Sequence, residues 1–336
     1  MPRHQFRRAL ATCLMIASAL LALLPKSVAA EQRAVRFRMD WIPSGMYAPF
    51  FYGYDAGVFA KNGIDLDIVN GNGSLTTIAD VDAGNVKFGM SGCAAAALAI
   101  SKGRKIVSVA SYMAKYSWAF YVPEDSAFKN IGDLRGKSVV VAPNSSEILL
   151  LPAVLKYAGV NPEDMKRVAV DPAQKIATYA RGVGDSTITT MAYGDPLVQQ
   201  AKPSRALLWS DAGFVMPDYC VIASTETVAK DPELVASFLK ATFESVAASE
   251  KNSSAAVDAS LKLRPLIQRA PTEKQWELTM GFLRSNNTKA CPLGWQSPKD
   301  WDIGLKTLKE YAGLEGDISN PDLFYTNKFI KCSASK

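Results

Sequence analysis

The chain has 336 residues, with 38 Lys and Arg, 32 Asp and Glu, and a single histidine, His4. A predicted export signal covers residues 1–30, and its removal takes away four basic residues and no acids, so the formal charge falls from +6 to +2. That near-neutral charge argues against a nucleic-acid or acidic-membrane partner. The remaining 306 residues (336 minus 30) lack histidine, which excludes Ser-His-Asp and Cys-His catalysis and His-ligated metal sites.

The N-terminus has the pattern of a secretory signal. Arg3, Arg7 and Arg8 precede an apolar run over 9–24, which is too short for a comfortable membrane span. Small residues at 28–30 then offer a cleavage site before Glu31. We expect an exported protein; the alternative is that the segment is retained as an N-terminal anchor.

The first elements after the signal form a strand–helix–strand pattern. Apolar and charged residues alternate over 35–40 and again over 64–68, as in strands, and an apolar helix that ends at Gly63 lies between them. Further elements alternate in the same way: a helix over 75–83, a strand over 86–90, an Ala-rich helix ending near 103, and strands over 106–110 and 118–122. This alternation favours an α/β protein with mainly parallel sheets.

A second unit of the same kind follows. Its predicted strands are 138–142, 168–170, 187–191 and 206–209, with helices over 144–158 and 174–181 and another introduced at 193–196. The segment 216–223 resembles a strand of the first unit, and helices are expected after Asp231, over 272–284 and over 298–312. The chain would then cross between units near 121–124 and 211–217. We therefore predict one lobe from 31–121 plus 215–336, and a second from 122–214.

Three loops that follow predicted strands also open helices. They carry small polar residues and free backbone N–H groups, which accept anions or polar ligand oxygens: Gly73-Ser74, Ser91-Gly92 and Asn144-Ser145-Ser146. A serine at such a position commonly just caps its helix. Because the ends of parallel strands face one cleft in a two-lobed protein, the three loops together indicate a binding site.

Aromatic and acidic residues gather near the same loops. Trp41 and Tyr47 lie in a loop, where a ring can stack on a ligand. The candidate acids at cleft edges, which could accept from a ligand amine or hydroxyl, are Asp40, Glu147, Asp195 and Asp218. Tyr193 and Tyr219 complete the candidate binding set. Each acid could instead be a solvated charge or a cap, and Asp195 in particular could cap a helix that begins at Pro196.

Four cysteines remain beyond the signal. Cys291 and Cys332 lie in a loop-rich C-terminal region of an exported chain, so we expect them to form a disulfide; four free thiols are the alternative. Cys93, at a predicted helix start, is either a thiol of lowered pKa or a small packing residue.

Several motifs carry a family resemblance. Asp40-Trp41-Ile42-Pro43, the segment 54–67, Gly71-Asn72-Gly73-Ser74, 132–137 and 322–329 resemble the NMT1-like, thiamin-pyrimidine group of periplasmic substrate-binding proteins, over about residues 35–330. The broad family includes sulfonate, nitrate and riboflavin binders. The resemblance implies a type II periplasmic-binding-protein-like fold, with two mixed, mostly parallel sheets flanked by helices around a hinged cleft.

The resemblance also implies a function. The protein would be a periplasmic, monomeric component that delivers a small solute to an ABC permease, without a cofactor, metal or catalytic residue. Asp40-Trp41 resembles the motif that places an aromatic against a pyrimidine ring, and Asp195-Pro196 stands where relatives often have Glu-Pro. The fungal enzymes of this superfamily use an active-site histidine and a Cys-rich iron motif, which this chain lacks.

Three hypotheses compete with that of an import component that binds a heteroaromatic ligand. The same scaffold could bind an aliphatic sulfonate, carboxylate or nitrate. An exported enzyme could use two carboxylates alone. A sensor domain would need a second membrane segment or a fused output domain, and the sequence has neither.

Overall fold

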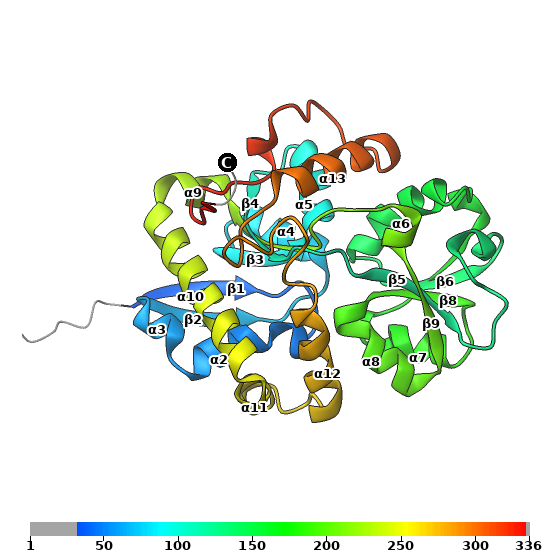
Figure 1. Ribbon diagram of the computed structural model, residues 1–336, viewed down its shortest axis with the longest axis horizontal. Coiled ribbons are helices and arrows are strands. Elements are labelled where there is room, and N and C mark those ends of the chain that lie inside the picture. Colours follow the sequence, from blue (N-terminus) through cyan, green and yellow to red (C-terminus); the bar gives the residue numbers. More distant parts are fainter. Residues whose placement is uncertain (1–31, 334–336) are drawn as a thin grey trace, which may run out of the picture. The chain divides into compact units, whose positions relative to one another are not determined.

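The computed structural model describes residues 32–333, so the predicted signal at 1–30 lies outside the described residues. Two five-stranded sheets form the centre of the fold (Figure 1). The first has the order β2 (Ile64–Val69), β1 (Arg33–Arg38), β3 (Phe88–Gly92), β10 (Tyr219–Ser224), β4 (Ile106–Met113). The second has the order β7 (Lys166–Ala169), β6 (Ser138–Val141), β8 (Ser186–Thr190), β5 (Trp118–Pro123), β9 (Ser204–Leu208).

Both sheets are mixed in the same way. β1 pairs in parallel with β2 and β3, whereas β10 is antiparallel to both β3 and β4. In the second sheet β6 pairs in parallel with β7 and β8, and β5 is antiparallel to β8 and β9. Four strands of each sheet therefore run one way and one runs the other. As a result β5 and β10 begin at the edge where their neighbours end.

Helices flank the sheets. They are α2 (Ala48–Asp55), α3 (Val58–Lys61), α4 (Ser74–Asp82), α5 (Cys93–Ser101), α6 (Ser146–Tyr157), α7 (Lys175–Ala180), α8 (Met191–Ala201), α9 (Thr225–Lys230), α10 (Pro232–Lys251), α11 (Ser253–Leu263), α12 (Arg269–Met280) and α13 (Pro298–Tyr311). Short 3-10 turns are η1 (Gly45–Tyr47), η2 (Ile131–Leu134), η3 (Pro162–Asp164), η4 (Pro172–Gln174), η5 (Trp209–Ala212) and η6 (Pro321–Leu323). Within residues 32–333, none of the helices combines the length and the apolar character that a bilayer crossing requires.

The predicted alternation accounts for the first strand. Val35 and Phe37 of β1 are buried, whereas Arg33 and Arg36 are exposed. The Phe37 ring stacks on Phe50 of α2 with centroids 4.4 Å apart, so the strand and the helix share one core. Burial of such a side chain stabilises the fold by about 1.5–3 kcal/mol.

Some helix boundaries differ from those that the sequence pattern predicted. The helix expected before Gly63 is interrupted at Gly57, which has a φ of 70° and separates α2 from α3. The helix expected to begin at Pro196 begins at Met191, with Thr190 as its N-cap and Pro196 inside it. Asp195 is therefore not a cap, because a threonine hydroxyl five residues earlier already accepts the Tyr193 N–H. Asp231 does cap α10, by accepting from the Leu234 N–H at 3.2 Å.

The two sheets take separate stretches of the chain. All strands of the second sheet lie between Trp118 and Leu208, and those of the first sheet lie on either side of that stretch. β5 begins at Trp118, so residues 118–121, which we assigned to the first lobe, are part of the second sheet. We retain the two-lobe division as a proposal, with its first crossing just before Trp118.

The cysteines divide into two kinds. Cys291 and Cys332, the pair that the sequence suggested, are joined in a disulfide with Cα atoms 5.1 Å apart. Cys93 and Cys220 are free and buried. Burial raises the pKa of the Cys93 thiol well above its usual value, so the alternative of a thiol with lowered pKa is wrong and Cys93 is a packing residue.

Candidate functional site

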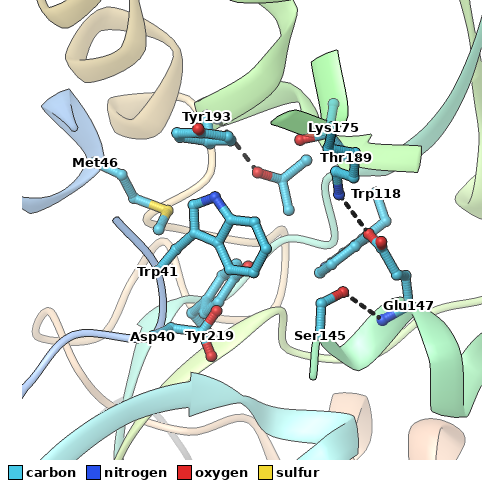
Figure 2. A pocket seen from close by; sticks show the side chains of 11 residues that line it. Asp40, Trp41, Met46, Trp118, Ser145, Glu147, Lys175, Thr189, Tyr193 and Tyr219 are labelled. Carbon is cyan, nitrogen blue, oxygen red and sulfur yellow. Dashed lines mark hydrogen bonds and ion pairs between the residues drawn. The ribbon is translucent and has the colours of Figure 1, made fainter. Parts of the chain in front are cut away.

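One cavity is lined by residues from both sheets (Figure 2). Its lining comprises Asp40, Trp41, Met46, Trp118, Ser145, Glu147, Lys175, Thr189, Thr190, Tyr193 and Tyr219. Asp40 and Trp41 directly follow β1 of the first sheet, and Thr189 and Thr190 end β8 of the second. Trp118 and Tyr219 begin the antiparallel strands β5 and β10. Strand ends of both sheets therefore meet at this cavity.

Trp41 forms one wall of the cavity. Only 6% of its surface is exposed, and its ring meets Tyr193 edge-on with centroids 6.3 Å apart. Tyr47, which we expected to contact a ligand, is instead fully buried in η1 and is absent from the lining. Its hydroxyl accepts a hydrogen bond from the Trp41 backbone N–H at 2.8 Å. Tyr47 thus holds the backbone of Trp41.

Asp40 is a buried carboxyl at the base of the cavity. Burial is the main cause that raises its pKa from 3.8 to about 7. The hydrogen bond from the Ser74 hydroxyl lowers the pKa again in part, and the neighbouring Tyr219 side chain and Gly92 backbone act in the same direction. Near neutral pH this carboxyl can therefore either hold a proton or accept a hydrogen bond from a ligand donor.

The serine loops bring the two sheets into contact beside Asp40. The Ser74 Oγ, which donates to Asp40, lies 2.7 Å from the Ser146 Oγ at the start of α6. The Gly92 N–H donates to the same Ser74 oxygen at 3.1 Å. The Leu75 N–H reaches the Asn144 carbonyl at 3.4 Å. The three loops singled out in the sequence therefore meet, but at the junction between the sheets rather than in the cavity lining, except for Ser145.

A second bridge lies at α12. The side-chain amide of Gln275 accepts from the Gly45 N–H at 2.9 Å and donates to the Tyr193 carbonyl at 2.8 Å. Gly45 adjoins Met46, and both Met46 and Tyr193 line the cavity. Gln275 itself is 3% exposed. This one side chain thus joins the η1 loop of the first-sheet side to α8 of the second.

A buried ion pair lies in the cavity wall. The Lys175 Nζ is 2.7 Å from the Glu147 Oε2, and the two side chains are 4% and 0% exposed. The other carboxylate oxygen of Glu147 accepts from the Ala142 N–H at 2.7 Å. The ammonium also lies 5.3 Å from the centroid of the Trp41 ring, within the range of a cation–π contact (Figure 2).

Asp218, just before β10, is a second buried carboxyl. It accepts from the Ser117 N–H at 3.0 Å and from the Trp118 indole N–H at 2.8 Å. Burial, chiefly, raises its pKa to about 7, and the nearby charge of Asp40 acts in the same direction. Asp218 does not line the cavity; it holds Trp118, which does.

Some candidate residues lie elsewhere. Asp195 accepts from the Tyr121 hydroxyl at 3.3 Å and is not part of the lining. Ser91 is buried, and its hydroxyl donates to the Gly92 carbonyl. The candidates that do line the cavity are Asp40, Trp41, Ser145, Glu147, Tyr193 and Tyr219. Between residues 32 and 333, no group of three or more His, Cys, Asp and Glu side chains could hold a metal ion.

Sequence reasoning missed five lining residues: Met46, Trp118, Lys175, Thr189 and Thr190. The threonines end a strand that was predicted, so the rule that ligands bind at strand ends could have found them. Trp118 begins its strand, and only knowledge that β5 is antiparallel places it at the cavity. Nothing in the sequence around Lys175 distinguishes it from a surface lysine.

Two known proteins are similar in sequence to most of this chain. The riboflavin-binding protein RibY of Chloroflexus aurantiacus is 23% identical over 302 residues, which cover 88% of this chain and 86% of RibY. The 4-amino-5-hydroxymethyl-2-methylpyrimidine phosphate synthase THI5 of Saccharomyces cerevisiae is 22% identical over 316 residues, covering 88% of this chain and 87% of that enzyme.

A solved structure shows the same fold. The alkanesulfonate-binding protein SsuA from Xanthomonas axonopodis pv. citri, bound to MOPS, superposes with a TM-score of 0.64 at 15% identity, covering 90% of this chain and 98% of that one. The fold is therefore that of the periplasmic binding proteins, as the resemblance implied. The sequence pattern of the NMT1/THI5 like family matches residues 45–256, and the chain belongs to that family.

Proposed function

We propose that the protein is the periplasmic solute-binding component of an ABC import system and that it captures a small heteroaromatic ligand between two lobes. A thiamin-precursor pyrimidine is the first candidate. The observation that carries this proposal is that one cavity combines the Trp41 indole with two carboxyl groups, Asp40 from the loop after β1 of the first sheet and Glu147 from α6, which follows β6 of the second. A ring stacked on the indole would place its amine within reach of a carboxyl oxygen.

Ligand capture would favour closure. A solute that contacts both lobes stabilises the closed form, and the permease would recognise that form. The junction of Ser74 with Ser146 and the Gln275 bridge would form only when the lobes are together. Export of the chain by residues 1–30 is part of this proposal, as are a monomeric state and the absence of a cofactor.

We infer that the protein is a binder and not an enzyme. RibY is named as a binding protein, whereas THI5 is named as a synthase, so relatives include both classes. The chain has no histidine beyond His4, and histidine is a residue on which we expect the fungal enzymes to depend. A carboxylate-only enzyme remains the alternative of a different class, and mass spectrometry of each candidate ligand after incubation with the protein would reveal any turnover.

A second ligand class has a specific basis. SsuA, which shares the fold, binds an alkanesulfonate, and Lys175 places a cation in the cavity wall here. An aliphatic sulfonate, carboxylate or nitrate is therefore the runner-up. The aromatic lining favours the heteroaromatic, because Trp41, Trp118, Tyr193 and Tyr219 present rings and no arginine is present in the lining.

The test is a thermal-shift screen followed by calorimetry. The mature protein would be screened with 4-amino-5-hydroxymethyl-2-methylpyrimidine, riboflavin, MOPS and nitrate. A ligand that binds only the folded state raises the melting temperature in proportion to RT ln(1 + [L]/Kd). We expect the pyrimidine to give the largest shift and Trp41→Ala to weaken its binding at least about tenfold, whereas Trp41→Phe retains most of it. Equal affinity of Trp41→Ala and wild type would contradict the stacking role.

A further inference from the structure

The cavity is too small for the ligand class that it would serve. Its volume is about 20 Å³, which is room for little more than one water molecule. A six-membered ring therefore enters only if the lobes part or a lining side chain moves away. If the lobes close again around the ring, some atoms that now fill the space must leave it.

Lys175 is the side chain best suited to leave. Burial does not distinguish the lining side chains, because Lys175 is 4% exposed and the four aromatic residues are 3–8% exposed. The difference is flexibility, since Trp41, Trp118, Tyr193 and Tyr219 have only two side-chain torsions each. Glu147 is fixed at the start of α6 by the Ala142 N–H. Lys175 begins the short helix α7 and has a flexible four-carbon stem, so its ammonium can reach solvent when the cleft opens.

The groups that Lys175 contacts define what could replace it. Its ammonium bonds one carboxylate oxygen of Glu147 and lies over the Trp41 ring. If Lys175 withdrew, an indole face and a carboxylate would remain, with the Asp40 carboxyl in the same lining. These groups recognise an ammonium, an amidinium or a protonated amino-heteroaromatic ring. An anion would instead meet the carboxyl groups of Asp40 and Glu147. The cation of the lining, Lys175, is already paired with Glu147.

We propose that the Lys175 ammonium occupies the position of the ligand, in contact with Trp41 and Glu147. A cationic ring that bears an amine would displace it from this position. This inference rests on the proposed function, in that the cavity is the solute site, and it narrows the solute to an aromatic cation. Lys175 lowers the apparent affinity, because a ligand must compete with a group of the protein itself. It also selects against neutral rings, since these cannot replace the lost contact with Glu147.

The experiment measures binding of protonated 4-aminopyridine to the mature protein by calorimetry, with benzenesulfonate as the anionic counterpart. In Lys175→Met the stem is retained and the competing charge is removed. We expect Lys175→Met to bind the cation about tenfold more tightly than wild type, with no gain for benzenesulfonate. The matched control is Lys115→Met: Lys115 also lies 5.3 Å from a ring centroid, that of Phe282, but outside this cavity. It should leave both affinities unchanged.

Two further variants test the role of Lys175. Lys175→Gln, which keeps a polar end beside Glu147, should show the same direction of change if Lys175→Met folds poorly. Glu147→Gln combined with Lys175→Met should lose the gain, because the carboxylate that attracts the cation is gone. Cation binding by Lys175→Met that is no tighter than in wild type would overturn the inference. So would benzenesulfonate binding that wild type shows and the variant lacks, because Lys175 would then hold a ligand anion.

Failure of this inference is distinguishable from failure of the proposed function. The proposed function fails if the wild-type protein binds no pyrimidine, flavin, sulfonate, carboxylate or nitrate. The role of Lys175 is decided by the difference between wild type and variants with the same simple probe, whatever the natural solute is.

Discussion

The carboxylate of Asp218 accepts the indole N–H of Trp118 at 2.8 Å, and these two residues stand at the two places where the chain passes between the sheets. The same carboxylate accepts the Ser117 N–H, and the Asp218 N–H donates to the Met113 carbonyl. One side chain therefore ties the segment that enters the second sheet to the segment that returns from it. If the lobes move about these two segments, the hydrogen bonds of Asp218 hold the segments together at the hinge.

We expect stability to rise as the pH falls from 8 to 5. Asp40 and Asp218 have folded-state pKa values of about 7, raised from 3.8 mainly by burial. A carboxyl with a raised folded pKa binds its proton more tightly in the folded state, so its contribution is present below pH 4 and is lost as the pH rises through 7. The gain is on the order of a few kcal/mol for the pair, which titrates as a coupled unit.

Melting temperatures at pH 5, 6, 7 and 8 would check this expectation. No histidine lies between residues 32 and 333, so histidine titration in this part of the chain does not contribute to the change between pH 5 and 8. Asp40→Asn and Asp218→Asn should each flatten the profile. A wild-type melting temperature that stays constant or falls between pH 8 and 5 would show that these carboxyls are ionised and well solvated.

Gly73→Ala should prevent full closure of the cleft. Gly73 has a φ of 110°, and a Cβ there would lie 2.2 Å from the Asn144 carbonyl oxygen, across the junction of the two sheets. The matched control is Gly84→Ala, because Gly84 also has a positive φ, 76°, but a Cβ there meets nothing within 4 Å. Both variants place an alanine at a positive φ, which costs about 1 kcal/mol in the left-handed region. The cost is larger at Gly73, whose ψ of 154° puts it in a region that only glycine adopts readily, and only Gly73→Ala adds the clash with Asn144.

Calorimetry and small-angle scattering separate the two glycine variants. We expect both to melt at lowered temperatures, Gly73→Ala at the lower of the two, and only Gly73→Ala to lose ligand affinity and ligand-induced compaction. Equal ligand affinity in the two variants would mean that the approach of Gly73 to Asn144 is unimportant for binding.

Gln275→Leu should weaken ligand binding without direct contact to the ligand. The substitution removes the bridge between the Gly45 N–H and the Tyr193 carbonyl, both of which are then left without that partner. Loss of two buried hydrogen bonds costs roughly 1–3 kcal/mol, and this cost falls on the closed arrangement. The affinity should therefore fall about tenfold or more, and the ligand dissociation rate measured by stopped flow should increase.

A suitable control for Gln275→Leu is Gln296→Leu. Gln296 is fully buried and bonds Ser108 and Thr326, away from the cavity. It should lower the melting temperature but leave the dissociation rate unchanged. Should both variants change the dissociation rate equally, the Gln275 effect would be one of general stability.

Reduction of the Cys291–Cys332 disulfide should destabilise the folded protein. The bond closes a loop with a sequence separation of 41 residues. Restricting such a loop in the unfolded chain is worth about 4 kcal/mol in the chain-entropy model. Cys291→Ser with Cys332→Ser should therefore lower the melting temperature by several degrees and make it insensitive to dithiothreitol. An unchanged melting temperature on reduction, with thiol release verified, would contradict this role; Cys93→Ser should leave the sensitivity to reductant intact.

The sequence by itself determined the fold class, the alternation of strands and helices, the first strand and much of the junction. Val35 and Phe37 alternate with arginines because a strand buries every second side chain, and Asp231-Pro232 begins a helix because cap chemistry is local. The three serine loops were visible because the ends of parallel strands share an edge.

The tertiary structure alone decided which candidate residues share the cavity. Trp118 and Tyr219 belong there because β5 and β10 run against their neighbours, and strand direction depends on long-range pairing. Tyr47 supports Trp41 from inside the core, and Asp195 is held by Tyr121 away from the cavity. Lys175, the first residue of α7, faces Trp41 in the loop after β1, although the two residues are far apart in the sequence. Local propensity does not predict such contacts, because they depend on the packing of segments that are distant in the sequence.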